Sequence, residues 1–158
     1  MKKVFTVEEI KRKMEQYCVY QDRCHKEVET KLKEYQLIPQ ARELILLHLF
    51  EHNFLNEERF SKSFARGKFR IKKWGKERIV RELKLRDITS ANIKIALKEI
   101  EEEDYIGTLN ELVEKKNLLI KESNLYKRKK KLFDYLKYRG YETELVMEVI
   151  NVIMKKPL

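Results

Sequence analysis

Glycine and proline, on which tight turns depend, are scarce in this sequence. Only four glycines and two prolines occur in 158 residues. A β-sandwich or barrel requires many short hairpins, and the turns of such hairpins favour glycine. The shortage therefore argues against these folds and predicts an all-helical (all-α) protein.

Cysteine is equally scarce, since only Cys18 and Cys24 are present. Two cysteines are too few for a disulfide framework or a four-ligand zinc site, which favours reduced thiols. Cys18, Cys24 and His25 also lack the close spacing of metal ligands. We therefore expect no metal site and no cofactor.

Long apolar runs are missing as well. No run of about 18 apolar residues could span a bilayer, so we expect no membrane contact. The N-terminal segment 1–5 is followed by Glu8 and Glu9 rather than by an apolar stretch with a cleavage site, which argues against a signal peptide. The sequence thus predicts a cytoplasmic protein, which we expect to be a monomer.

The glycine-containing motifs of common enzymes do not occur. The sequence has no G-x-x-x-x-G-K-[ST], G-x-G-x-x-G or G-x-S-x-G pattern. Machinery for nucleotide hydrolysis or for a serine triad is therefore not visible. These absences predict that the protein is not an enzyme.

Basic residues, by contrast, are abundant and unevenly placed. The formal net charge is +10. Residues 59–86 include twelve basic and two acidic residues, and residues 127–139 include seven basic and one acidic residue. The segment 99–104 between them is acidic. Patches of this kind indicate a polyanion or a charged protein partner, although helices with solvated Lys and Arg remain the alternative.

Apolar residues repeat along the chain. Three pairs spaced by four residues are offset by 51 and then 53 positions: Val28 and Leu32, Ile79 and Leu83, Leu132 and Leu136. Each pair is followed, 13, 14 and 17 positions after its second member, by three further apolar residues. This spacing is typical of one face of a helix. The repeat therefore predicts two apolar helices in each of three units.

Short links separate the two apolar helices of each unit. Asp87 and Gly140 occupy equivalent positions and suit the left-handed conformation that follows a helix. Pro39, Ser90 and Thr143 align as the starts of the next helices. We interpret the proline as a first-turn residue and the other two as N-caps.

A further helix precedes each pair. The capping-box pattern of residues 6–9 predicts that the first begins near Thr6 and extends to about Tyr20. The second is expected from about Glu57 and the third from Thr108. The sequence thus predicts three tandem three-helix repeats in an elongated, curved arrangement. Their expected ranges are 1–55, 56–106 and 107–158.

One short motif resembles a zinc site. His48, Glu51 and His52 match the H-x-x-E-H pattern of inverted zinc peptidases. The same helix already carries Leu46 and Leu49 of the repeated apolar face. Because the repeat accounts for this helix, we favour a structural interpretation, with metal catalysis as a distant alternative.

Trp74 lies among cations, nine residues before Leu83, where the other units have Arg23 and Lys127. It either staples the start of its helix or presents a ring to a partner, and the sequence does not separate these alternatives. Aromatics interleaved with cations suit nucleic-acid backbones or protein interfaces. The candidate contact residues are Arg66, Lys68, Arg70, Lys72, Lys73, Trp74, Lys76, Arg78 and Arg81, with Lys127, Arg128, Lys129, Lys130 and Lys131.

Several motifs together resemble the RecX family, regulators of the RecA recombinase. The resemblance covers nearly the whole chain. Asn56, Ser61 and Asp87 depart from the residues usual in the family. The motifs that carry the resemblance are residues 54–61 with Phe64, residues 75–79 with Glu82 and Leu83, the first-unit residues Arg23, Cys24, Glu27, Val28, Lys31 and Leu32, and Arg139, Gly140 and Tyr141.

The resemblance implies a non-enzymatic, all-helical protein that binds the RecA filament on single-stranded DNA. Such proteins typically inhibit ATP hydrolysis and strand exchange. The alternative is a stand-alone helical repeat protein that binds nucleic acid non-specifically. Sequence-specific DNA reading is disfavoured because no second helix has an obvious base-reading face.

Overall fold

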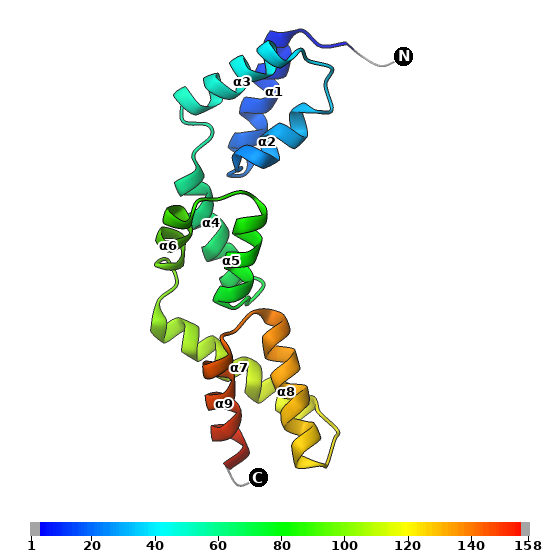
Figure 1. The fold of residues 1–158 in the computed structure, drawn as a ribbon, viewed down its shortest axis with the longest axis vertical. Helices are drawn as coiled ribbons and strands as arrows, with labels where there is room; N and C mark the ends of the chain where they lie inside the picture. Colours follow the sequence, from blue (N-terminus) through cyan, green and yellow to red (C-terminus); the bar gives the residue numbers. More distant parts are fainter. Residues whose placement is uncertain (1–3, 156–158) are drawn as a thin grey trace.

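The computed structural model describes residues 4–155, so Met1, Lys2 and Lys3 of the N-terminal segment considered above lie outside it. Within this range the chain forms nine helices and no strand. Three helices make up each of three units, which stack into an elongated, curved body (Figure 1). The helices are α1 (Val7–Tyr20), α2 (His25–Leu32) and α3 (Pro39–Glu51) in the first unit, α4 (Glu57–Arg70), α5 (Lys76–Leu85) and α6 (Ser90–Leu97) in the second, and α7 (Glu102–Leu119), α8 (Leu125–Arg139) and α9 (Thr143–Lys155) in the third.

Local signals place most helix starts. The Thr6 hydroxyl accepts a hydrogen bond from the Glu9 backbone N–H, and the Glu9 carboxylate accepts one from the Thr6 N–H, which completes the predicted capping box. Pro39, Ser90 and Thr143 each begin a helix. The predictions that Ser90 and Thr143 are N-caps were each wrong by one residue, because both are the first residues of their helices. The cap of α6 is Thr89, whose side chain accepts a hydrogen bond from the Asn92 N–H.

The third unit begins earlier than its sequence pattern predicted. We expected a helix from Thr108, but α7 starts at Glu102. Glu102, Glu103 and Asp104, from the acidic segment between the two basic patches, form its first turn. Carboxylates there interact favourably with the positive end of the helix dipole. The division of the chain at residues 55 and 106 stays a prediction, and α7 runs through the second of these positions.

The repeated apolar pairs are the centre of the core. All six residues are at most 1% exposed. The second and third units share one continuous cluster of buried side chains, whereas the first unit has a separate cluster around Met14, Ile45 and Leu49. Cys24 is the exception, because it belongs to the first unit but packs into the larger cluster.

Two glycines form the junction between the second and third units. A Cβ on Gly75 would overlap the backbone of Gly140, and a Cβ on Gly140 would overlap Arg78. This close approach allows two hydrogen bonds between the units, from the Gly75 N–H to the Arg139 carbonyl at 2.7 Å and from the Glu77 N–H to the Gly140 carbonyl at 2.9 Å. Gly140 has a φ of 99°, as its place in the link predicted.

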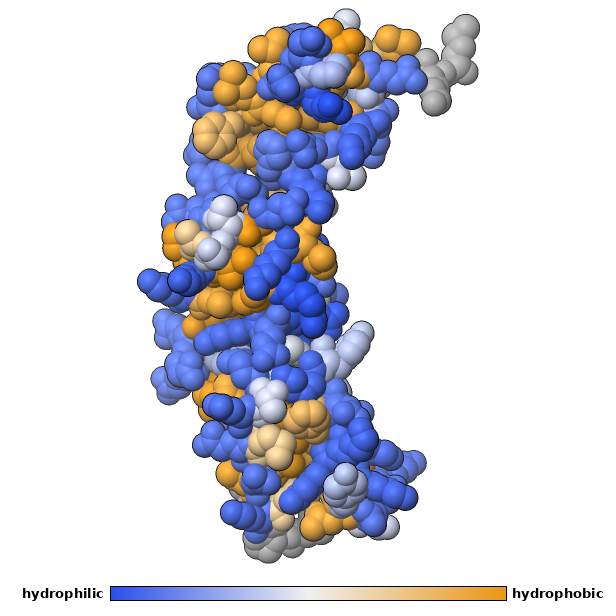
Figure 2. Space-filling view, viewed as in Figure 1, coloured by the Kyte–Doolittle hydropathy of each residue, from blue (hydrophilic) through white to orange (hydrophobic). Residues whose placement is uncertain are grey.

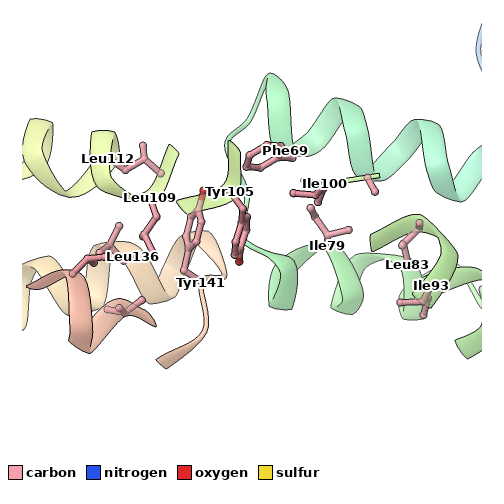
Figure 3. Packing of buried hydrophobic residues seen from close by; sticks show 14 of the residues in the cluster. Phe69, Ile79, Leu83, Ile93, Ile100, Tyr105, Leu109, Leu112, Leu136 and Tyr141 are labelled. Carbon is pink, nitrogen blue, oxygen red and sulfur yellow. The ribbon is translucent and has the colours of Figure 1, made fainter. Parts of the chain in front are cut away.

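Tyr105 and Tyr141 close this junction from the core side. Their rings stack with centroids 5.2 Å apart, and both side chains are fully buried (Figure 3). The Tyr105 hydroxyl donates to the Glu142 carboxylate and accepts from the Lys76 N–H, while the Tyr141 hydroxyl donates to the Lys73 carbonyl. Burial, aided at Tyr105 by the Glu142 hydrogen bond, raises the pKa of both phenols.

The equivalent junction between the first and second units uses side chains. Lys26 donates to the Leu85 carbonyl at 2.9 Å and lies 3.6 Å from the Asp87 carboxylate. Arg59 pairs with Asp22 at 2.8 Å. Asp87 occupies the place of Gly140 and has the predicted left-handed conformation, with a φ of 58°. Both junctions therefore have a left-handed residue in the link, but backbone hydrogen bonds join one and side-chain contacts join the other.

Replacing Gly75 by alanine tests the glycine junction. We expect G75A to lower the free energy of unfolding by about 1–3 kcal/mol, because the added methyl group separates the two units. G67A is the matched control, since Gly67 lies inside α4 with nothing within 4 Å of an added Cβ. The free energy of unfolding of G67A should rise by about 0.5–1 kcal/mol. Urea titration measures both, and equal stability of G75A and the parent protein would contradict the junction.

The buried phenols make stability fall at alkaline pH. Their folded pKa lies above that of the unfolded chain, so their contribution is complete below the ordinary tyrosine value of about 10 and is lost as the pH rises above it. Urea unfolding at pH 8 and at pH about 10.5 should show this loss. The free energy of unfolding should fall less between these two pH values in the double variant Y105F/Y141F. An equal fall in the variant and the parent protein would exclude these tyrosines as its source.

Candidate partner-binding surface

Trp74 is the centre of a row of rings and cations on the second unit. The Arg78 guanidinium lies 4.3 Å from the centre of its ring, and the Lys68 ammonium lies 5.1 Å from it. Phe64 of α4 meets Trp74 edge-on at 6.3 Å. The half-buried indole therefore packs its own connection against α4, as the staple interpretation predicted, and also holds two cations at the surface.

Tyr138 of the third unit extends this row across the junction. Arg78 lies 5.0 Å from its ring and also donates to its backbone carbonyl at 3.3 Å. Tyr138 is 73% exposed. We call Phe64, Lys68, Trp74, Arg78 and Tyr138 the cation–aromatic row. Sequence reasoning missed the contribution of Tyr138, because only the packing of Gly140 on Gly75 brings α8 beside α5.

Three of the predicted contact residues already have an anionic partner within the molecule. Arg66 pairs with Glu99 at 2.7 Å. Lys76 lies 3.5 Å from Glu102 of α7. The third pair joins Lys130 and Asp134, 3.0 Å apart on one face of α8. Their charges are partly offset, which reduces their share in any field that attracts a polyanion.

Arg128 has a structural environment. Its guanidinium donates to the carbonyls of Asn117, Ile120 and Glu122, and to the Asn117 side chain, at 2.5–3.0 Å. These acceptors lie at the end of α7 and in the connection to α8. Arg128 therefore holds this connection, although from the sequence it was grouped with four neighbouring lysines as a candidate contact residue.

The remaining predicted cations divide between three places. Arg70 and Lys73 share a surface hollow with Glu103, Asp104 and Glu111 of α7. Lys72 is exposed beside them, and its carbonyl accepts a hydrogen bond from Arg139. Arg81 is exposed on α5 and has no acidic partner within residues 4–155. The others, Lys127, Lys129 and Lys131, lie in the first half of α8.

The structure does not bring the two basic clusters together. The first half of α8 lies at the far end of the third unit, whereas α5 adjoins the other end of that unit (Figure 1). Hydrophilic residues cover much of one face of the body, interrupted by apolar patches (Figure 2). The second unit is therefore the stronger candidate surface, since it combines rings with cations that have no acidic partner in the described chain.

The histidine motif has a structural explanation. His48 meets Glu15 of α1 at 2.7 Å, and the His48 and His52 rings lie 4.4 Å apart. The described residues contain no group of three His, Cys, Asp or Glu side chains that could hold a metal ion. Cys18 and Cys24 are buried free thiols, and burial raises the pKa of Cys24 to about 11. None of the helices described is long and apolar enough to cross a membrane.

Two family models match the chain. The model of the second three-helix domain of RecX matches residues 56–97, and the model of its third three-helix domain matches residues 102–150. Together they cover more than half of the chain. The fold and these matches define a tandem helical repeat protein. The chain belongs to the RecX family.

Relatives and solved structures agree with this assignment. The chain is 29% identical over 141 residues to the regulatory protein RecX of Lactobacillus gasseri, covering 86% of this chain and 51% of the relative. It is 30% identical over 131 residues to that of Clostridium beijerinckii, covering 82% and 61%. The crystal structure of RecX from Lactobacillus salivarius shares the fold, with a TM-score of 0.81, 19% identity, and coverage of 94% of this chain and 96% of that one. The chain thus spans about half to three fifths of the curated relatives it matches.

The contrast between Arg128 and its neighbour Lys127 is testable. We expect R128A to lower the free energy of unfolding by about 1–2 kcal/mol, because several charge-assisted hydrogen bonds are lost. K127A, at an exposed position, should change it by less than about 0.5 kcal/mol. Thermal or urea unfolding checks the pair, and equal stabilities would mean that Arg128 does not hold the connection.

Proposed function

We propose that this chain is a regulator that binds the RecA filament on single-stranded DNA and lowers its ATPase and strand-exchange activity. Membership of the RecX family supports this role. The observation that carries it is the surface of the second unit. Four members of the cation–aromatic row lie in the same unit as Arg81, a cation without an acidic partner in the described chain.

An elongated body suits a polymeric target. Three stacked units can lie across several subunits of a helical filament, so that many modest contacts add to one binding event. Complementary charge raises the association rate and makes it sensitive to salt. An inhibitor of this kind acts below one molecule per filament subunit, because each molecule affects a stretch of polymer.

A second candidate is direct binding of single-stranded nucleic acid without a recombinase. The cation–aromatic row favours it, since exposed rings such as Tyr138 stack on bases and adjacent cations contact phosphates. Its sign is affinity for bare DNA that falls steeply with salt concentration.

The ATPase of RecA from the same organism, measured with single-stranded DNA, tests the proposal. We expect substoichiometric amounts of this protein to lower the rate. The charge-reversal variant K72E/K73E should weaken filament binding by well over the roughly 0.5 kcal/mol of a neutral surface change. Binding is measured by titrating fluorescently labelled protein into preformed filaments.

K94E/K98E is the matched control, because Lys94 on α6 and Lys98 at its C-cap are both exposed and neither has an acidic partner in the described chain. It should inhibit like the parent protein. An unchanged ATPase rate, together with tight binding to bare DNA in the same buffer, would favour the second candidate. Equal filament affinity of K72E/K73E and the parent would exclude Lys72 and Lys73 from the interface.

A further inference from the structure

A groove on the second unit lies apart from the cation–aromatic row. It occupies about 630 Å³ between α5, the end of α6 and the link before α9. Val80, Leu85 and Leu97 form its apolar floor, and Lys76, Arg81 and Lys84 form its basic rim. Apolar residues gather over α5 and α6 with hydrophilic residues along their borders (Figure 2).

The acids near this groove are already engaged. Glu77 accepts from Lys137 at 2.8 Å, and Glu142 accepts from Tyr105. Lys76 is offset by Glu102. Arg81 and Lys84, by contrast, face no acidic partner among the residues described. The rim therefore carries two exposed cations whose charge is uncompensated.

The other two units lack this combination at the same positions. In the first unit Glu29 and Glu34 replace Val80 and Leu85, so the apolar floor is interrupted. In the third unit Asp134 replaces Arg81 and pairs with Lys130. An apolar floor beneath uncompensated cations is thus particular to the second unit, and it is not a general consequence of the repeat.

We infer that this groove binds an acidic amphipathic helix of a protein partner. Apolar side chains of such a helix would fill the floor, and its carboxylates would meet Arg81 and Lys84. An extended segment has no strand edge to pair with in residues 4–155. Stacked bases are disfavoured because the floor is aliphatic and offers no ring.

The inference rests on the proposed function only in taking the partner to be a protein.

The probe is a fluorescein-labelled helical peptide about four turns long, with leucines on one face and glutamates on the other. We expect saturable binding by fluorescence anisotropy. R81E/K84E, and separately L85D at a position 60% exposed, should each weaken it by about tenfold or more.

Two controls separate the groove from general basicity. K94E/K98E should bind the probe within about twofold of the parent protein. A peptide of the same composition, shuffled so that its leucines share no face, should bind far more weakly. Circular dichroism and thermal unfolding confirm that each variant is folded before its affinity is compared.

The contrary outcomes are distinct. Equal binding of the shuffled peptide, or undiminished binding by both R81E/K84E and L85D, would overturn the inference. Displacement of the probe by oligo(dT) with the same dependence on Arg81 and Lys84 would assign the groove to nucleic acid instead. No RecA is present in these measurements, so failure of the parent protein to bind the probe, with its ATPase inhibition intact, would contradict this inference alone.

Discussion

The close approach of Gly75 and Gly140 determines how the second and third units sit together. Without side chains at these two positions, the start of α5 and the link before α9 come near enough for direct backbone hydrogen bonds. The same approach brings Tyr105 and Tyr141 face to face (Figure 3) and lets one buried cluster run through six helices. It also places Tyr138 beside Arg78, so the candidate surface depends on the same contact.

Much of the fold could be predicted because its signals are local. Residues four apart on a helix share a face, and the repeated pairs such as Ile79 and Leu83 are buried as this spacing requires. Capping chemistry likewise acts within one turn, which is why the start of α1 was predicted correctly. The early start of α7 was missed because acidic residues suit both a solvated linker and the first turn of a helix.

The candidate site was less predictable, since side chains of like charge differ only in what they meet in space. Arg128 and Lys127 are neighbours in a basic run, but one holds the connection to α7 and the other is exposed. Arg66 forms an ion pair with Glu99, 33 residues away in the chain, which partly offsets its charge. Trp74 packs against Phe64 as the staple interpretation predicted, whereas the contact of Arg78 with Tyr138 depends on a junction that no local pattern encodes.

The separate core of the first unit has a consequence for how the molecule opens. Its buried cluster is not continuous with the other, and side-chain pairs such as Arg59 with Asp22 join it to the second unit. We expect such an arrangement to let the first unit unfold locally while the other two stay folded, which would divide amide hydrogen exchange into two levels of protection. Cys24 is buried against the larger cluster, so we expect its thiol to become accessible when the first unit separates from the second. The rate at which that thiol is labelled would then report partial unfolding of the molecule.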